Sequence, residues 1–234
     1  MSISGQIESV LEKIRAAEKK AGRPAGSVSL VAVSKTVEPA RVLEAFQAGV
    51  KDFGENRVQE LLEKKKDPAL QGKDIRWHMI GGLQTNKVKQ AVGEAVLIHS
   101  LDRIELAEEI SRQAEKKGMP FVDCLIQVNS SGEATKQGLA PAEVFDFAQS
   151  IEGLRVRVRG LMTIGPLTED TARIRACFRE VRELREKLAK EFPRKDWGVL
   201  SMGMSGDYEI AIEEGSTLVR IGSAIFGARP RPQG

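Results

Sequence analysis

Short apolar runs alternate with amphipathic stretches along most of the chain of 234 residues. The opening segment repeats apolar residues every three or four positions, which predicts an amphipathic helix over residues 3–21. Eight later runs are short, apolar and rich in β-branched residues, which is typical of buried strands. These runs are Val28–Val33, Val50–Phe53, Ile75–Met79, Val96–His99, Phe121–Val128, Val158–Met162, Val199–Met202 and Leu218–Ile221.

Helical periodicity separates most of these runs. The predicted helices cover Glu38–Gly49, Arg57–Lys66, Leu101–Lys117, Pro141–Ser150, Thr171–Lys190 and Asp207–Glu214. Alternating strands and helices imply parallel strands, and eight parallel strands close a barrel. We therefore predict an α/β fold, a single (β/α)8 TIM-type barrel domain over residues 1–234, with a flexible tail over 228–234. A doubly wound open sheet is the alternative, because a strand count taken from the pattern can miss or add a strand.

One strand-like region carries an unusual charge pattern. Arg155, Arg157 and Arg159 alternate with two valines. A guanidinium buried inside a barrel without partners would be costly. We therefore expect these arginines at the N-terminal mouth of the barrel, where they reach solvent.

The charge balance argues against a nucleic-acid partner. Lys and Arg number 36 against 33 Asp and Glu, a formal net charge of +3. The basic residues are interleaved with Glu along Arg179–Lys187, as on a solvated helix face. Only 5% of the residues are aromatic, too few to provide a stacking surface for single-stranded bases.

The sequence also bears on the cellular compartment of the protein. No apolar run approaches membrane-spanning length, and the N-terminus lacks the apolar core of a signal peptide. Cys124 and Cys177 lie far apart in the sequence and form no C-x-x-C motif, so we expect two buried, reduced thiols. We expect a cytoplasmic protein without a membrane partner.

Polar residues gather where the predicted strands end. In a barrel of this kind the functional site forms at the C-terminal ends of the strands. The residues at those ends are Lys35, Glu55, Asn56, His78, Ser100, Asn129, Thr163, Ser201, Ser205, Arg220, Gly222 and Ser223. Their concentration at one end of an otherwise apolar barrel indicates a binding site there.

The last two clusters are suited to phosphate. Loops after the seventh and eighth strands of such barrels often bind phosphate through backbone N–H groups. Here Gly203, Gly206 and Gly222 allow close backbone approach, and Ser205 and Ser223 supply hydroxyl donors. Each glycine alone could serve only a tight turn, but two adjacent clusters favour phosphate.

Lys35 and His78 are the other candidates. A lysine after a buried strand is usually solvent-facing, but beside a phosphate site it offers the amine that pyridoxal 5'-phosphate (PLP) requires. His78 could contact such a cofactor or could be a hydrogen-bonded wall residue. We interpret His99 and Asn129 as structural polar groups. The two histidines have no paired Cys or Asp at ligand spacing, so we expect no metal site.

The chain resembles the pyridoxal phosphate homeostasis proteins from about Val28 to Gly227. The segments that carry the resemblance, in order, are Val33–Thr36, Phe53–Arg57, His78–Lys87, Gln127–Asn129, Gly132–Gly138, Gly160–Ile164, Leu200–Asp207 and Val219–Gly227. The resemblance implies a barrel like the N-terminal domain of alanine racemase, the fold type III of PLP proteins. It also implies that Lys35 holds PLP as a Schiff base, that Ser205 and Gly222–Ser223 bind its phosphate, that Arg220 faces the pyridine nitrogen, and that Asn56 and His78 border the ring.

Three functions remain after this step. The favoured one is a PLP-binding protein of vitamin B6 homeostasis with no catalytic residue, a monomer that serves PLP-dependent apoenzymes. The second is an amino-acid racemase-like enzyme, which needs a base on each face of the substrate carbon. The only tyrosine, Tyr208, is expected on the surface in the first turn of a helix rather than as that base. The third is a barrel that acts on a phosphorylated metabolite without PLP.

Overall fold

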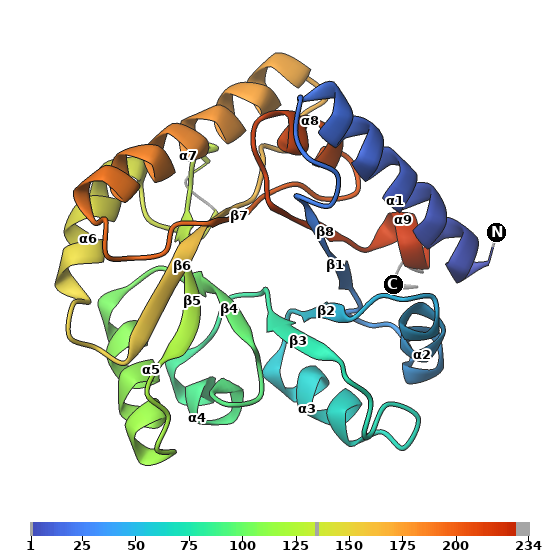
Figure 1. The fold of residues 1–234 in the computed structure, drawn as a ribbon. Coiled ribbons are helices and arrows are strands. Elements are labelled where there is room, and N and C mark those ends of the chain that lie inside the picture. The colour runs from blue at the N-terminus through green and yellow to red at the C-terminus, as the bar shows by residue number, and fades with distance from the viewer. Residues whose placement is uncertain (1, 134–135, 228–234) are drawn as a thin grey trace.

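A closed barrel of eight parallel strands forms the centre of the protein, in the order β1 to β8 (Figure 1). The computed structural model describes residues 2–133 and 136–227. The strands are β1 Ser29–Val33, β2 Asp52–Glu55, β3 Arg76–Met79, β4 Leu97–Leu101, β5 Val122–Val128, β6 Val156–Thr163, β7 Val199–Ser201 and β8 Leu218–Ile221. Strand β1 pairs with β8 over Ser29–Ala32, which closes the barrel and excludes the open sheet. The predicted barrel is confirmed.

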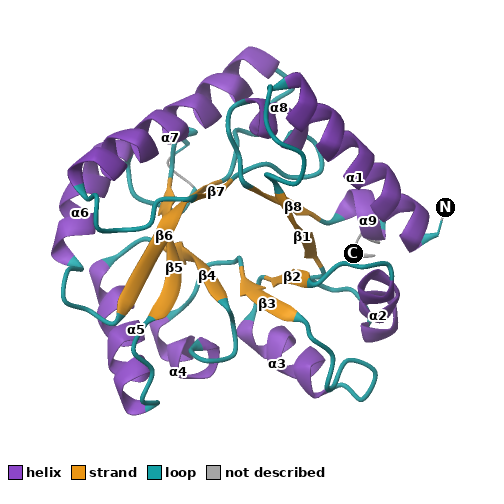
Figure 2. Cartoon of the chain, in the orientation of Figure 1, coloured by secondary structure: helices purple, strands orange, loops and turns teal. Residues whose placement is uncertain are grey.

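A ring of helices surrounds the strands (Figure 2). The helices are α1 Ile3–Lys20, α2 Pro39–Gln47, α3 Val58–Lys66, α4 Val88–Ala91, α5 Ile104–Lys116, α6 Val144–Ser150, α7 Thr171–Glu191, α8 Tyr208–Glu213 and α9 Ser223–Phe226. Two 3-10 turns, Thr85–Lys87 and Pro141–Glu143, precede α4 and α6. The sequence pattern did not predict α4 or α9, because a helix of four residues completes barely one turn and shows no periodicity. The predicted tail, 228–234, lies outside the described residues.

Helix α1 covers the seam between the first and last strands. Its Ser2 cap accepts a hydrogen bond from the Gly5 amide, and its apolar face is buried. That face joins one hydrophobic cluster with Ala32 of β1 and Val219 of β8, and it packs against α8 and α9. Because α9 is too short to cover β8, the helix that shields this side of the barrel comes from the beginning of the chain.

The barrel interior holds a small apolar layer of Val31, Leu97, Leu125, Met162 and Leu218. Most of the remaining apolar residues face outward and pack under the helices. This interior layer separates the two mouths of the barrel.

The three arginines around β6 lie at the N-terminal mouth, as predicted. Arg155 precedes the strand, and the side chains of Arg157 and Arg159 are 52% and 35% exposed. Arg157 donates to Asp123 Oδ2 at 2.8 Å, and Arg159 pairs with Asp196 at 3.0 Å. Carboxylates at the rim therefore compensate the charges that the pattern placed beside the strand.

Gly160 allows β6 and β7 to pair. Its φ is +142°, and a Cβ at this position would lie 1.8 Å from the carbonyl oxygen of Val199. We expect Gly160→Ala to lower the free energy of unfolding by about 1–3 kcal/mol or more, because the strands must move apart. Urea unfolding measures this, with Gly5→Ala in α1 as the matched control that is neutral or up to about 1 kcal/mol stabilising. Equal unfolding midpoints for Gly160→Ala and the wild type would contradict the close approach.

Candidate functional site

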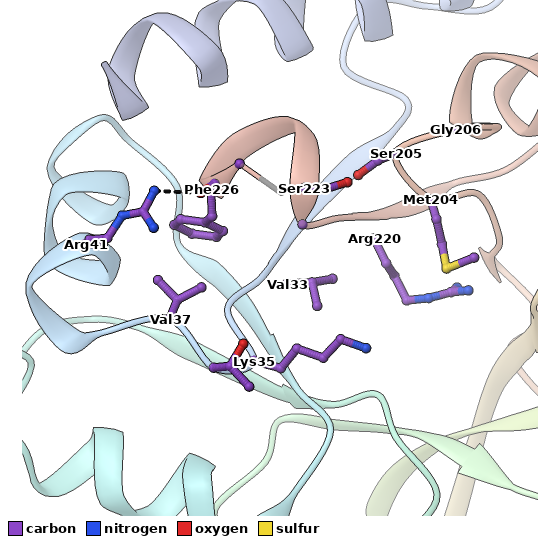
Figure 3. A pocket seen from close by; sticks show the side chains of 13 residues that line it. Val33, Lys35, Val37, Arg41, Met204, Ser205, Gly206, Arg220, Ser223 and Phe226 are labelled. Carbon is purple, nitrogen blue, oxygen red and sulfur yellow. Dashed lines mark hydrogen bonds between the residues drawn. The ribbon is translucent and has the colours of Figure 1, made fainter. Parts of the chain in front are cut away.

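A cavity of about 320 Å³ opens at the C-terminal end of the barrel, between the segments that follow β1, β7 and β8. Its lining consists of Val33, Lys35, Thr36, Val37, Arg41, Met204, Ser205, Gly206, Arg220, Gly222, Ser223, Phe226 and Gly227. The structure thus brings together Lys35, Ser205, Arg220, Gly222 and Ser223, five of the seven residues that the sequence selected. Figure 3 shows the amine of Lys35 and the guanidinium of Arg220 pointing into the same space, with the hydroxyls of Ser205 and Ser223 side by side at the other end.

A buried ion cluster holds the backbone on both sides of Lys35. Lys64, only 4% exposed, donates to the carbonyl oxygen of Ser34 at 2.5 Å, to Glu55 Oε1 at 2.7 Å and to Glu60 Oε1 at 2.8 Å. The hydroxyl of Ser34 donates to Glu55 Oε1 at 2.6 Å. On the other side, the amide of Thr36 donates to Glu60. The position of the Lys35 backbone therefore depends on three charged side chains outside the cavity.

Two residues of this cluster are held in energetically unfavourable states. Thr36 has a φ of +61°, a left-handed conformation that a β-branched residue rarely adopts, and its bond to Glu60 holds it there. Burial raises the pKa of Glu55 to about 7, although the charge and hydrogen bond of Lys64 oppose that rise. Within the described structure, Glu55 Oε2 accepts no hydrogen bond. The Glu55 carboxylate is therefore hydrogen-bonded through Oε1 alone, with Lys64 as its counter-ion.

The opposite end of the cavity is formed by the loops after β7 and β8. The amide of Ala224 donates to Ser205 Oγ at 3.3 Å, which links the two loops. Gly203 has a φ of +98°, and a Cβ there would lie 2.7 Å from Ala211 of α8. Only glycine therefore lets this loop pass close to α8. A Cβ at Gly206 would meet nothing within 4 Å, because this backbone borders the open cavity.

Arg220 both lines the cavity and braces the barrel. Its NH1 donates to Ser201 Oγ at 2.6 Å, and its NH2 donates to the carbonyl oxygen of Thr163 at 2.8 Å. Burial lowers the pKa of Arg220 to about 10, with the charge of Asp207 opposing. Arg220 therefore remains a cation at neutral pH.

Asn56 and His78 do not reach this cavity. Asn56 lines a separate hollow beside Gly82 and Gln137. His78 is buried inside the barrel, where Nε2 faces Asp52 at 3.0 Å and Nδ1 faces His99 at 3.0 Å. That both border the ring of a bound cofactor stays a prediction. The sequence located the strand ends correctly but could not show which way each side chain points.

Arg41 and Met204 also line the cavity, and the sequence analysis gave neither of them a role. Arg41 of α2 donates to the carbonyl oxygen of Phe226 at 2.6 Å and lies over its ring at 5.9 Å. Met204, 38% exposed, forms part of the rim. Arg41 stands on a helix surface with no motif around it, so nothing in the sequence distinguishes it from a solvated arginine.

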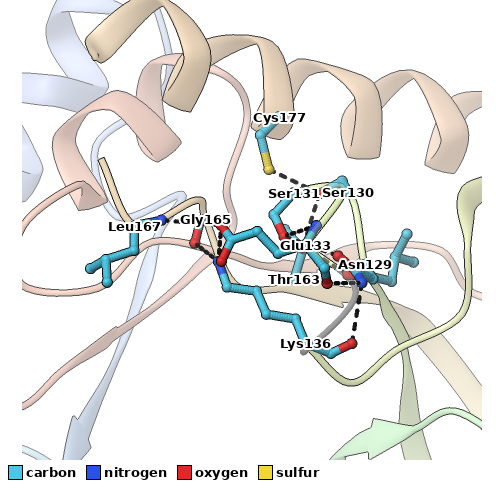
Figure 4. A network of polar contacts seen from close by, with 10 residues as sticks. Asn129, Ser130, Ser131, Glu133, Lys136, Thr163, Gly165, Leu167 and Cys177 are labelled. Carbon is cyan, nitrogen blue, oxygen red and sulfur yellow. Dashed lines mark hydrogen bonds and ion pairs between the residues drawn. The ribbon is translucent and has the colours of Figure 1, made fainter. Parts of the chain in front are cut away.

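A polar network fixes the loop after β5 (Figure 4). Lys136 Nζ donates to the Gly165 carbonyl at 2.8 Å and pairs with Glu133 at 3.0 Å. Asn129 donates to the carbonyls of Glu133 and Lys136 at 3.0 and 3.1 Å, which agrees with the structural role predicted for it. The loop after β5 is thereby tied to the loop after β6.

Both cysteines are buried and free, as predicted. Burial raises the pKa of the Cys124 thiol and of the Cys177 thiol, so both are protonated at neutral pH. Cys177 lies 2.9 Å from the hydroxyl of Ser130. The thiols therefore act as packing groups and not as nucleophiles.

The chain matches the family model described as alanine racemase, N-terminal domain, over residues 6–230. The structure of PipY from Synechococcus elongatus with PLP bound is 35% identical, with a TM-score of 0.84 over 97% of this chain and 100% of that chain. A pyridoxal phosphate homeostasis protein of Aquifex aeolicus is 47% identical over 230 residues, 98% of this chain and 99% of that protein. This chain belongs to the pyridoxal phosphate homeostasis protein family.

Alanine racemase resembles this member of the homeostasis protein family in its fold alone. The enzyme of Clostridium difficile 630 is 13% identical with a TM-score of 0.74, over 97% of this chain and 58% of the enzyme. Tyr208, which was predicted at the surface, is only 4% exposed. The prediction was wrong because α8 packs beside α1, so that Tyr208 enters the cluster under that helix. Tyr208 is not among the residues that line the cavity.

Two kinds of feature are absent from the described part of this homeostasis protein. None of its helices has the length and apolar character to cross a membrane. Residues 2–133 and 136–227 contain no group of three or more His, Cys, Asp or Glu side chains that could hold a metal ion.

Proposed function

We propose that the protein binds PLP in the cavity, as a Schiff base on Lys35, and serves intracellular vitamin B6 homeostasis without appreciable catalysis. The observation that carries the proposal is the cavity itself, with a lysine amine at one end and two serine hydroxyls at the other (Figure 3). The name of the Aquifex aeolicus relative and the PLP bound to PipY support it.

The chemistry of the lining fits the cofactor. An aldehyde requires an amine, which Lys35 supplies, and a phosphate requires hydrogen-bond donors, which Ser205, Ser223 and the backbone of Gly222 supply. Arg220 provides a cation that has donors only. When bound, PLP supplies an electron-withdrawing ring that can stabilise a carbanion.

The same lining argues against turnover. PLP withdraws electrons best when its ring nitrogen is protonated, and a cationic Arg220 at that position favours the unprotonated nitrogen. The described residues that line the cavity include no His, Asp, Glu, Cys or Tyr, and Lys35 is the amine that would hold PLP. Proton transfer on both faces of a substrate carbon would need a second base.

A racemase-like activity is the alternative, favoured by the barrel shared with alanine racemase. An amino-acid turnover assay with the PLP-loaded protein distinguishes the two functions. Racemisation or transamination at rates typical of enzymes, about 1–10³ s⁻¹, would overturn the non-catalytic function.

We further propose that the whole chain is one barrel domain, and that it acts as a cytoplasmic monomer and donates PLP to PLP-dependent apoenzymes. Sedimentation gives the oligomeric state. Recovery of activity by an apoenzyme mixed with the loaded protein, compared with the same amount of free PLP, tests the transfer.

Borohydride is expected to fix PLP to Lys35. The reason is the position of its amine in the cavity, opposite the two serines. Loss of the visible absorbance on reduction and peptide mapping check this, and the label should fall in the peptide with Val33–Thr36. Lys35→Met serves as the control and should retain no label. A label found mainly on Lys87 or Lys136 would show that the site is assigned wrongly.

A further inference from the structure

A row of hydrogen bonds crosses the barrel interior from the N-terminal mouth to the cavity. His78 bridges Asp52 and His99 at 3.0 Å on each side, and His99 Nδ1 lies 3.0 Å from Ser201 Oγ. Ser201 in turn accepts from Arg220 at 2.6 Å. His99 and Ser201 are wholly buried, whereas Asp52 also pairs with Arg76 at the mouth. The row joins strands β2, β3, β4, β7 and β8.

With neither histidine doubly protonated, the two ends of the row fix the direction of every bond in it. An ionised Asp52 only accepts, so His78 must carry its proton on Nε2. A neutral His78 then accepts at Nδ1, so His99 must donate from Nε2 and accept at Nδ1. Ser201 donates its hydroxyl proton to His99, and its oxygen accepts from the donor-only Arg220. Every member therefore donates toward Asp52.

The charge states that this direction requires are those that burial and neighbours favour. Burial, aided by the charge of Arg220, lowers the pKa of His99 well below its ordinary value. Burial raises the pKa of Asp52, but hydrogen bonds from His78 and Arg76 lower it overall. At neutral pH His99 is therefore neutral and Asp52 is ionised.

We infer that Asp52, His78, His99 and Ser201 are positioning residues that fix the guanidinium of Arg220 in the cavity through one directed chain of hydrogen bonds. The inference rests on the proposed function, because Arg220 is the group that would face the cofactor ring. Arg220 is 4% exposed, and within the described structure its guanidinium donates to two neutral acceptors, Ser201 and the Thr163 carbonyl. A chain that ends on an anion polarises Ser201 as an acceptor, which compensates this buried cation.

Two charged groups lie outside the chain but act on its ends. Asp207 acts on Arg220 through its charge, and Arg76 holds Asp52 by a hydrogen bond. Neither lies between the two histidines, so the tautomers of His78 and His99 report on the chain of hydrogen bonds alone.

The first test is NMR of the wild-type protein without PLP, with isotope-labelled histidine nitrogens. The protein has two histidines, so four ring nitrogens account for the whole spectrum. We expect both rings to be neutral at pH 7, with the proton on Nε2 and none on Nδ1. A doubly protonated ring, or the Nδ1–H tautomer on either histidine, would overturn the inference without any variant being needed.

The second test compares two serines of the β7–β8 region. Ser201→Ala removes the donor to His99, so the Nδ1 signal of His99 should shift, and the visible absorbance maximum of bound PLP should shift with it. Ser201→Thr keeps the hydroxyl and should restore both. Ser216→Ala is the matched control, because the buried Ser216 hydroxyl donates only to backbone carbonyls and should leave both signals unchanged.

An equal response in Ser216→Ala, or an absorbance maximum that Ser201→Ala leaves unchanged, would show that the chain of hydrogen bonds does not act on the cofactor site. A wild-type protein that binds no PLP would refute the proposed function and the role of the chain toward the ring. The tautomers of the protein without PLP would then still decide the direction of the chain, so the two failures are distinguishable.

Discussion

The double variant Ser205→Ala, Ser223→Ala is expected to bind PLP about 10²- to 10⁴-fold more weakly than the wild type. Each hydrogen bond to a charged group contributes about 1.5–3 kcal/mol, and every 1.4 kcal/mol is about tenfold in affinity. The two hydroxyls lie side by side at one end of the cavity, and an amide of α9 already links their loops. Titration of the protein with PLP, followed by absorbance, gives the two dissociation constants.

Pyridoxal without its phosphate is the control ligand for this variant. It keeps the aldehyde that reacts with Lys35 but has no group for the two serines. The wild type should bind it poorly, and the double variant should bind it no worse than the wild type does. Equal affinity of the wild type for pyridoxal and PLP would rule out a phosphate site at these serines.

Lys64→Met is expected to lower the free energy of unfolding by about 3–5 kcal/mol near pH 9. The substitution leaves the Glu55 carboxylate buried without its counter-ion and near the negative charge of Glu60, with Oε2 already lacking a hydrogen bond among the described residues. It also removes the bonds from Lys64 to Ser34 and Glu60, which hold the backbone beside Lys35. Urea unfolding gives the free energy, and the rate of PLP binding reports on Lys35.

The pH dependence of this loss follows from Glu55. Its pKa is about 7 in the folded protein against an ordinary value of 4.5, and removing Lys64 raises it further. Between those values the folded state keeps a proton that the unfolded state has released, so stability falls as pH rises. The difference between variant and wild type should therefore be small near pH 6 and should grow above pH 7.

Glu55→Gln combined with Lys64→Met isolates the charge. This double variant also lacks Lys64, but it has no carboxylate that could be left buried without a counter-ion. The increase of the stability loss with pH should therefore disappear. A loss for Lys64→Met that is the same at pH 6 and pH 9 would mean that lost packing, and not a buried charge, destabilises the fold.

The sequence predicted the barrel well because its strands differ sharply from their surroundings in composition. All eight strands lie within two residues of the predicted bounds at either end. Lys35, Ser205 and Arg220 were found because a barrel directs the ends of its strands to one mouth. The same rule does not bring His78 to this cavity, because its side chain points into the barrel interior, where it contacts Asp52 and His99. Tyr208 was misplaced because nothing in the sequence shows that α8 packs beside α1.

The order of the elements along the chain also governs when the site can form during synthesis. Helix α1 leaves the ribosome before any other described element, whereas α8 and α9, against which it packs, come last. Its apolar face, which includes Ile7, Val10 and Ile14, contacts α2 earlier but lacks the surfaces of α8 and α9 until then. The cavity likewise needs Lys35 from the first strand and Ser223 from the last helix. A nascent chain stopped before β7 would therefore expose the lysine amine and much of the apolar face of α1 together, without either of the serines proposed to bind the phosphate.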